Sequence, residues 1–168
     1  MLEKLCPRYR AESIFALEPE TLRAQGIKGL ILDLDNTLVE WGSEIVPAEL
    51  VAWVDRFKKA GFKLCIVSNA VPQRVEAVAE TLGIPGLPQA TKPFKTSFKR
   101  ALAILGTAPE ETAVIGDQLF TDILGGNRMD LYTIWTPPLS ETEFLSTRAV
   151  RRLERLVVKR FRKRGLWG

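Results

Sequence analysis

Short runs of apolar residues alternate along the chain with longer segments in which apolar residues recur every three or four positions. The short runs predict buried β-strands, because a strand covered on both faces has apolar side chains at nearly every position. Four predicted strands span residues 27–34, 63–67, 112–115 and 131–135. A proline-rich segment between the second and third of these leaves room for at most a short extra strand at residues 89–90.

The longer periodic segments predict amphipathic helices. They span residues 18–25, 47–60, 71–82, 96–105, 121–127 and 140–163. Strands that alternate with helices predict an α/β fold, in which a parallel sheet is built from right-handed crossovers. Ligands bind such folds beyond the carboxyl ends of the strands, so chemistry is expected there.

The composition narrows the chemistry. The chain has 168 residues, enough for one domain, and contains no His. This excludes Ser-His-Asp triads, Cys-His pairs and His-ligated zinc. The two cysteines, Cys6 and Cys65, are too few for a disulfide framework, which favours a reducing, cytoplasmic location. No apolar run approaches the ~20 residues that span a bilayer, and the N-terminus does not resemble a signal peptide.

Acidic residues follow two of the predicted strands. Asp33 and Asp35 stand two positions apart at the end of the first strand, so their side chains are expected on the same side of an extended chain. Asp117 follows the third strand, and Asp122 lies at the turn into the next helix. Carboxylates gathered at one sheet edge repel each other and lose hydration unless a cation joins them. Oxygen ligands of this kind predict a Mg²⁺ site.

Two further segments carry groups that bind phosphate. Ser68 and Asn69 follow the second strand and stand where either could cap the next helix, whose free amides favour an anion. Lys92 lies before another helix and offers a compact positive charge. Each of these residues taken alone would equally suit a helix cap or a turn. Together with the carboxylates they indicate phosphoryl transfer, in which positioning and charge neutralisation do most of the work.

Four motifs in this order resemble those of the haloacid-dehalogenase-like (HAD) phosphatases. They are Asp33-Leu-Asp35-Asn-Thr37, Ser68, Lys92-Pro93 and Gly116-Asp117-x4-Asp122. The resemblance covers about residues 27–135 and implies a three-layer, Rossmann-like HAD core. The segments GIKGLILDLDNTLVEW and GDQLFTDILGGN resemble the YqeG-type subfamily of group IIIA, and this similarity extends to both flanks. Eukaryotic relatives of that subfamily include mitochondrial phosphatidylglycerophosphate phosphatases.

The resemblance also implies a role for each site residue. Asp33 would attack phosphorus to form an aspartyl-phosphate, and Asp35 would protonate the leaving oxygen and then activate water. Lys92 would offset negative charge; Lys95 is the alternative, and Lys92 is preferred because Lys-Pro matches the family pattern. The phosphate would be held by Thr37, Ser68 and Asn69. The Mg²⁺ ligands would be Asp33, the main-chain carbonyl of Asp35, and Asp117, supported by Asp122.

The spacing of the motifs predicts that the core has no cap domain. Asp35 and Ser68 are 33 positions apart, and Ser68 and Lys92 are 24 apart, which leaves room for one helix in each interval. The mouth of the site is therefore expected to be open, unless an oligomer partner or the C-terminal tail covers it. An open mouth favours a phosphate on a large or surface-presented carrier, such as a membrane lipid, a protein or a nucleic acid.

The charge of the chain is unevenly distributed. Nine basic residues and one Glu lie from Arg148 to Arg164, a net +8, whereas the rest of the chain carries −4 of the total +4. We therefore divide the chain into a core, residues 1–139, and a basic helix and tail, residues 140–168. On a helical wheel seven of the nine basic residues lie opposite one apolar arc, and Arg160 and Arg164 do not. The arc contains Leu145, Ala149, Val150, Leu153, Leu156, Val157 and Phe161.

Two interpretations of this basic helix remain open. The helix could pack on the sheet and expose its basic face to solvent, or it could bind an anionic membrane and place the protein at the inner membrane surface. Nucleic acid is less favoured, because no aromatic residues are interleaved with the basic ones to stack on bases.

The sequence thus predicts a capless, Mg²⁺-dependent phosphomonoesterase. The preferred substrate is a phospholipid headgroup phosphate such as that of phosphatidylglycerophosphate, on the strength of the resemblance and of the basic tail. Two alternatives remain. One is a nucleic-acid- or ribosome-associated binding protein with a vestigial HAD core. The other is a phosphatase for soluble sugar phosphates or phosphoproteins.

Overall fold

The computed structural model describes residues 2–140, 145–165 and 167, and the side chains of residue 2 and of residues 145–149 lie outside this description. The described chain forms a six-stranded sheet in the order β1-β6-β5-β2-β3-β4, and every pairing is parallel. The strands are β1 (Tyr9–Arg10), β2 (Gly29–Leu32), β3 (Lys63–Val67), β4 (Gly86–Leu87), β5 (Thr112–Gly116) and β6 (Tyr132–Trp135). The predicted parallel α/β fold is therefore confirmed.

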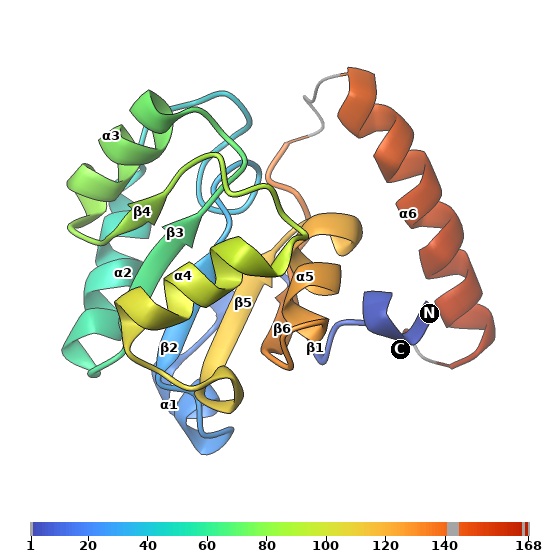
Figure 1. Ribbon diagram of the computed structural model, residues 1–168, viewed down its shortest axis with the longest axis horizontal. Helices are drawn as coiled ribbons and strands as arrows, with labels where there is room; N and C mark the ends of the chain where they lie inside the picture. Colours follow the sequence, from blue (N-terminus) through green and yellow to red (C-terminus); the bar gives the residue numbers. More distant parts are fainter. Residues whose placement is uncertain (1, 141–144, 166, 168) are drawn as a thin grey trace.

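Helices and helical turns connect these strands (Figure 1). The helices are α1 (Pro19–Ala24), α2 (Ala48–Lys59), α3 (Pro72–Leu82), α4 (Lys95–Leu105), α5 (Leu124–Asn127) and α6 (Leu145–Lys163). Short 3₁₀ turns are η1 (Leu2–Leu5), η2 (Ile14–Ala16) and η3 (Pro109–Glu111), and η4 (Leu119–Ile123) is a π-helical turn. The π-helical turn leads directly into α5, where the sequence predicts one helix over residues 121–127.

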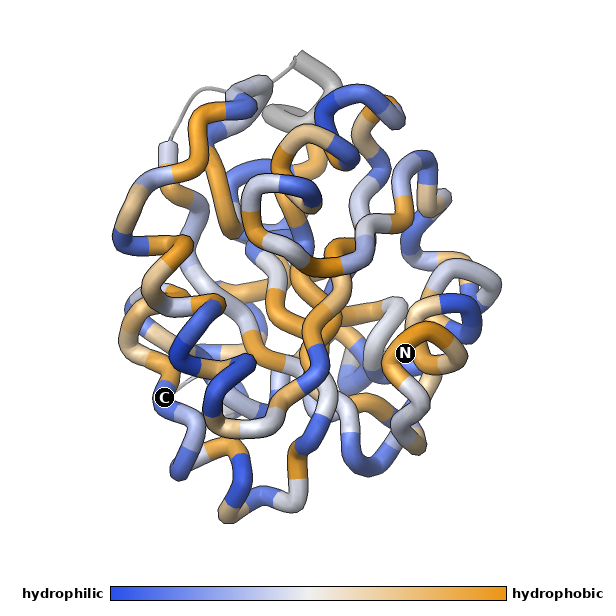
Figure 2. The backbone as a smooth tube through the Cα atoms, turned by 90° about the vertical axis from the view of Figure 1, so that its left-hand side faces the viewer, coloured by the Kyte–Doolittle hydropathy of each residue, from blue (hydrophilic) through white to orange (hydrophobic). Residues whose placement is uncertain are grey.

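The sheet separates two apolar cores and so forms the middle of three layers. Leu30 and Leu32 of β2 point into a core shared with α1, α2 and α3, whereas Ile31 points to the opposite face. There it meets Phe98 of α4 and Cys65 of β3, which is fully buried. Figure 2 shows these apolar segments running through the centre of the molecule. The alternation follows from the two-residue period of a strand, and it puts helices on both faces.

Two edge strands differ from the predictions. The prediction of a short strand at residues 89–90 is wrong, because the strand that pairs with β3 is β4, through Gly86 and Leu87. Gln89 and Thr91 have φ values of 46° and 54°, which are incompatible with an extended strand. At the other edge, β1 adds to β6 with only two exposed residues, too few to produce an apolar pattern in the sequence.

The described chain has no cap domain, as predicted. Between Asp35 and Ser68 it forms a single α-helix, α2, and between Ser68 and Lys92 it forms α3 and the two-residue β4. The carboxyl edge of the sheet is bordered by loops of the core and by α6. None of the helices in the described ranges combines the length and the apolar composition needed to cross a bilayer.

The last helix, α6, lies beside the β1–β6 edge and next to the N-terminal turn η1 (Figure 1). Phe161 and the following Trp167 are buried with Leu5, Leu119 and Ile123, and the Phe161 and Trp167 rings stack at 5.8 Å. The helix therefore packs against the core through this apolar cluster, which joins residues from the predicted core, 1–139, to residues from the predicted helix and tail, 140–168. The division into residues 1–139 and 140–168 stays a prediction.

The predicted apolar arc of this helix faces the core only in part. Leu153 and Leu156 are 56% and 60% exposed, and Glu154 is buried in their place. The reason is a set of polar contacts between α6 and the segment that follows β5, which fixes the rotation of the helix. Residues 141–144 of the predicted helix lie outside the described residues, as do the side chains of Leu145, Arg148 and Ala149.

Candidate active site

The carboxyl ends of three central strands bring the predicted site residues together. In the sheet, Leu32 of β2 pairs with Ile115 of β5 on one side and Ile66 of β3 on the other. The residues that follow these strands must therefore meet at one edge. Asp33, Ser68 and Asp117, which stand 35 or more positions apart in the sequence, become neighbours in this way.

Three carboxylates form a buried cluster at this edge, which we call the carboxylate cluster: Asp33, Asp117 and Asp122. One oxygen of each lies within 4.8 Å of the others, and the residues are 7%, 0% and 1% exposed. Asp122 reaches the cluster because the main-chain N–H groups of Asp122 and Ile123 both donate to the Gln118 carbonyl, which widens the η4 turn. Gly116 is required beneath it, because a Cβ at that position would overlap the Asp122 side chain.

Lys92 occupies the centre of this arrangement. Its Nζ lies 2.5 Å from Asp33 Oδ1 and 2.6 Å from Asp122 Oδ1, and its side chain is 3% exposed. Burial alone would lower the pKa of Lys92, but the carboxylates of Asp122 and Asp33 outweigh it and raise the pKa above its ordinary value. Lys92 therefore stays positively charged. Lys95, the alternative from the sequence, is exposed at the start of α4.

Asn69 acts on the main chain of Lys92. Its Oδ1 accepts a hydrogen bond from Lys92 N at 2.9 Å, and its Nδ2 donates to Lys92 O at 3.5 Å. Asn69 thus holds the turn from which the Lys92 side chain enters the site. Direct phosphate binding by Asn69 stays a prediction.

The two predicted hydroxyl groups lie at the edge of the cluster. Thr37 Oγ1 is 3.2 Å from Asp33 Oδ2 and 3.4 Å from Asp117 Oδ1, so it borders both carboxylates. Ser68 is buried, and its Oγ accepts a hydrogen bond from Ala70 N. The expectation that Ser68 or Asn69 caps the next helix is wrong, since α3 begins at Pro72 and its N-cap is Val71. The Ser68 hydroxyl closes the preceding turn instead.

Asp35 lies outside the carboxylate cluster. Its carboxylate is bound by both terminal nitrogens of Arg74, at 2.7 and 3.2 Å, and accepts a further hydrogen bond from Gly42 N. Arg74 also donates to the Ser43 carbonyl and so ties α3 to the loop after Asp35. The sequence reasoning missed Arg74. Its position in the first turn of the helix after Ser68 is the signal that could have found it.

A second missed residue, Arg151, comes from α6. Its Nη1 donates to the main-chain oxygen of Asp117 at 2.8 Å and to Glu154 Oε2 at 2.9 Å, and its Nη2 pairs with the Asp117 carboxylate. Glu154 also accepts a hydrogen bond from Leu119 N at 2.6 Å. These contacts cause the rotation of α6 noted above. Nothing in the sequence distinguishes Arg151 from the other basic residues of the helix.

The electrostatics of the cluster favour a cation. Its three carboxylates share two positive partners among the described side chains, and one of these, Arg151, also pairs with Glu154. Burial and the nearby Asp122 raise the pKa of Asp33 to about 6, against the lowering effect of Lys92. Burial and Asp33 also raise the pKa of Asp117 well above its usual range. Close, buried carboxylate oxygens with excess negative charge fit a hard divalent metal ion.

Asp33, Asp117 and Asp122 are the residues whose side chains could hold such an ion. The Asp35 side chain points to Arg74, so its predicted contribution is the main-chain carbonyl, which stays a prediction. The arrangement as a whole offers a buried carboxylate beside a permanent cation, a hydroxyl group and a metal site. These are the groups that a phosphoryl-transfer reaction uses.

Comparison with known proteins defines the class. Residues 40–130 match the family model of the haloacid dehalogenase-like hydrolases, and the chain belongs to this family. It is 40% identical to the probable phosphatase YqeG of Bacillus subtilis over 98% of this chain and 96% of that protein. The fold, the family and these relatives identify the chain as a phosphoric monoester hydrolase.

Other relatives carry a lipid in their names. The chain is 30% identical to phosphatidylglycerophosphate phosphatase 1 of Arabidopsis thaliana over 95% of this chain, although it spans only about half (49%) of that protein. It is 35% identical to the mitochondrial phosphatidylglycerophosphatase of Saccharomyces cerevisiae, over 65% of this chain and 66% of that one.

Solved structures share the fold. An uncharacterised protein from Listeria monocytogenes matches 70% of this chain and 85% of its own, with a TM-score of 0.57 and 20% identity. The cobalt-bound deoxy-D-mannose-octulosonate 8-phosphate phosphatase of Haemophilus influenzae matches 67% and 69%, with a TM-score of 0.54 and 17% identity. The three-layer HAD fold is therefore confirmed.

Proposed function

We propose that this phosphatase depends on Mg²⁺, works through an aspartyl-phosphate on Asp33, and acts on the headgroup phosphate of a phospholipid of the phosphatidylglycerophosphate type. The observation that carries the chemistry is the placement of the Lys92 ammonium between Asp33 and Asp122. A buried carboxylate is a poor nucleophile for a dianion unless fixed positive charge stands beside both reactants. Lys92 supplies that charge at the nucleophile.

The reaction begins when an Asp33 oxygen attacks phosphorus and the bond from phosphorus to the leaving oxygen breaks. Thr37 Oγ1, next to Asp33 Oδ2, is placed to donate to a phosphoryl oxygen. Water then attacks the aspartyl-phosphate, releasing inorganic phosphate and restoring the Asp33 carboxylate. A Mg²⁺ ion held by Asp33, Asp117 and Asp122 would offset the negative charge of the phosphoryl group.

Asp35 is the proposed acid and base. Its carboxylate must give a proton to the leaving oxygen in the first step and take one from water in the second. Asp35 follows the nucleophile Asp33 by two positions in the sequence. Both terminal nitrogens of Arg74 bind the Asp35 carboxylate and fix the direction in which it points.

The lipid substrate is supported by the relatives and by the shape of the core. Two of the relatives are named for phosphatidylglycerophosphate, and one of them aligns with 95% of this chain. The lack of a cap domain between Asp35 and Ser68 leaves the site accessible to a phosphate held at a surface. Caps in other enzymes sequester small substrates from water.

The test compares phosphatidylglycerophosphate in vesicles with a panel of soluble phosphomonoesters, by phosphate release with Mg²⁺ present. We expect faster turnover of the lipid, loss of activity on chelation, and loss of activity in Asp33→Asn. The control is Asp130→Asn, an exposed residue with a φ of 59° that Asn tolerates equally. Equal or faster turnover of a soluble compound would overturn the lipid assignment. Full activity of Asp33→Asn would overturn the mechanism.

A further inference from the structure

An apolar groove with a volume of about 720 Å³ lies between α6 and the turns η1 and η4. Its apolar walls come from three separate segments of the chain: Leu5 of η1, Phe120 of η4, and Leu153, Leu156 and Val157 of α6. We call this the α6 groove. It lies on the opposite side of the helix from Glu154 and Arg151, which contact the active-site edge.

Two leucines of the α6 groove are largely exposed to solvent. Leu153 and Leu156 are 56% and 60% exposed, whereas Phe161, on the core-facing side of the same helix, is 1% exposed. Residues three positions apart on a helix lie on one face, so the two leucines form a continuous apolar strip. Keeping such a strip in water costs free energy, which indicates that it binds something.

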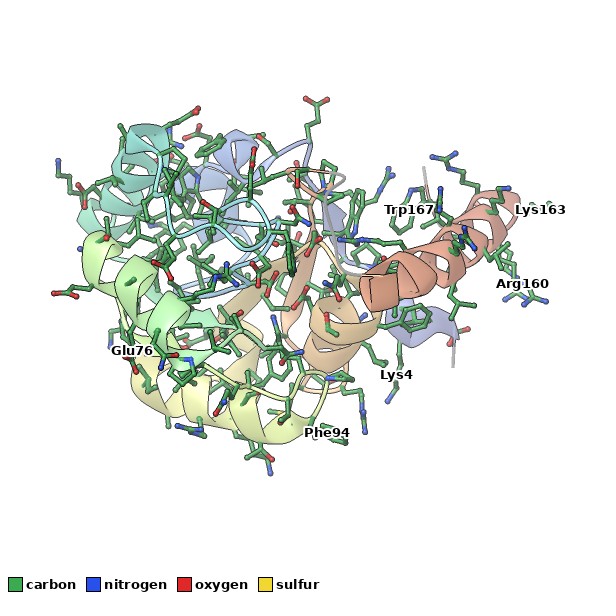
Figure 3. The ribbon with its side chains drawn as sticks, turned by 90° about the horizontal axis from the view of Figure 1, so that it is seen from above. Lys4, Glu76, Phe94, Arg160, Lys163 and Trp167 are labelled. Carbon is green, nitrogen blue, oxygen red and sulfur yellow. The ribbon has the colours of Figure 1, made fainter. Side chains whose placement is uncertain are left out.

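The groove also has a basic rim, formed by Lys159, Arg160 and Lys163. Arg160 and Lys163 continue the leucine strip, because residues 153, 156, 160 and 163 follow the spacing of one helical face. In Figure 3 the side chains of Arg160 and Lys163 lie at the outer end of α6, away from the sheet. Glu154, the sole acidic residue from Arg148 to Arg164, is buried against Leu119 N and does not neutralise this rim. An occupant must therefore be apolar in one part and anionic in another.

This combination selects among the candidate occupants. A second copy of the chain docked through the same face would bring two basic rims together, which is unfavourable for a symmetric dimer. A nucleic acid would satisfy the charges but leave the leucines exposed to water. The interface of an anionic phospholipid bilayer supplies both acyl chains and phosphates, and helices with one apolar face and flanking cations lie in that interface.

The groove and the catalytic edge are contacted by the same stretch of α6, on opposite sides of the helix. Arg151, which binds Asp117, precedes Leu153 by two residues, a rise of about 3 Å along the helix axis. The same helix therefore contacts the carboxylate cluster on one side and carries the groove on another. A surface bound at the groove would lie about one helix width, ~10 Å, from the contacts that α6 makes with the carboxylate cluster.

We propose that the α6 groove is a docking face for anionic phospholipid bilayers, with Leu153 and Leu156 inserted among the lipids and Lys159, Arg160 and Lys163 on the headgroup phosphates. This proposal rests on the proposed function in one respect, because docking would serve to present a lipid phosphate to the site. Docking itself needs no turnover and can be measured without it.

The experiment is co-sedimentation of the full chain with vesicles of phosphatidylglycerol and phosphatidylcholine, compared with vesicles of phosphatidylcholine alone. We expect binding to the anionic vesicles to fall at least tenfold in Leu153→Ser/Leu156→Ser and in Arg160→Glu/Lys163→Glu. The matched controls on α4 are Ile104→Ser, which changes another exposed apolar residue, and Lys99→Glu/Arg100→Glu, which makes the same change in charge. Both controls should bind like the unmodified chain.

Each alternative result overturns the docking proposal. Equal binding to neutral vesicles, unchanged binding of the groove variants, or equal losses in the α4 controls would each do so. So would a chain that sediments as a dimer in free solution and becomes monomeric in Leu153→Ser/Leu156→Ser, because a second copy would then occupy the groove.

Hydrolysis of p-nitrophenyl phosphate separates the two proposals. It should be unchanged in the groove variants, since the small ester does not need the docking face. Vesicle binding without hydrolysis of any phosphomonoester would overturn the proposed function and leave docking intact. Lipid hydrolysis with unaltered binding of the groove variants would overturn docking alone.

Discussion

Arg151, on the last helix, donates hydrogen bonds to both the main-chain oxygen and the carboxylate of Asp117 at the end of β5. The C-terminal helix is thereby connected to the candidate metal site. Because the metal and the guanidinium would contact the same carboxylate, binding of one should alter the contribution of the other. Stability measured with and without Mg²⁺ can reveal this relationship.

Replacing Arg151 by Met should lower the free energy of unfolding by about 3 kcal/mol in the absence of Mg²⁺, because Asp117 and Glu154 lose a positive partner. Saturating Mg²⁺ should reduce this loss, since the ion supplies positive charge to Asp117. Urea unfolding with and without Mg²⁺ measures both values. Arg155→Met, an exposed position on the same helix, is the control. A loss of the same size in both conditions would contradict the idea that Arg151 and the ion share Asp117.

Lys92→Met should reduce the turnover of phosphomonoesters by at least about 100-fold, the scale seen when one fixed stabilising donor is removed from an active site. The physical reason is the loss of the ammonium group that contacts both Asp33 and Asp122. Lys95→Met makes the same chemical change at an exposed position and should stay within about twofold of the unmodified enzyme. Steady-state kinetics measure the turnover of both variants. A greater loss of turnover in Lys95→Met than in Lys92→Met would identify the exposed Lys95 as the active-site lysine.

The buried Asp33 should make the metal-free protein less stable as the pH rises. Its folded pKa of about 6 lies above the unfolded value of 3.8, so the fold binds this proton more tightly than the unfolded chain does. The resulting stabilisation is fully present below pH 3.8 and is lost as the pH rises through about 6. In Asp33→Asn the group does not ionise. This variant should gain stability relative to the unmodified protein between pH 4 and pH 8, by up to about 3 kcal/mol.

Thermal or urea unfolding of both proteins across that pH range, in the presence of a chelator, measures this gain. Adding Mg²⁺ at pH 8 should reverse it, because the ion binds the ionised carboxylate of the unmodified protein. A constant difference between the two proteins from pH 4 to pH 8 would show that Asp33 ionises freely in the fold.

Gly116→Ala should displace Asp122, because the added Cβ would overlap the Asp122 side chain. We expect a loss of about 1–3 kcal/mol in the free energy of unfolding, typical of overpacking, together with a loss of activity. The double variant Gly116→Ala/Asp122→Gly removes all three overlapping atoms, Cβ, Cγ and Oδ2 of residue 122, and should recover part of the stability but none of the activity. Additive losses of the two single changes in a double-mutant cycle would show that the two positions do not interact.

The catalytic strand ends could be predicted because their signals are local. A strand such as Lys63–Val67 is buried on both faces, so its side chains are apolar and its ends stand out in the sequence. Polar residues at several such ends must meet, since parallel strands share one carboxyl edge. Asp33, Ser68 and Asp117 are predictable in this way. Lys92 is predictable from its charge and its place before a helix, and the resemblance of its Lys-Pro motif favours it over Lys95. The edge strand β1, with two exposed residues, has no comparable signal.

The sequence by itself determined the parallel α/β fold, the absence of a cap and the residues around Asp33, because apolar period and strand order dictate them. The tertiary structure alone decided that Arg74 pairs with Asp35 and Arg151 with Asp117. It also decided that α6 buries Glu154 and exposes Leu153 and Leu156. Helical periodicity defines which residues share a face, whereas polar contacts with distant segments set which face turns inward. Those contacts join residues 34 or more positions apart, and no local pattern records them.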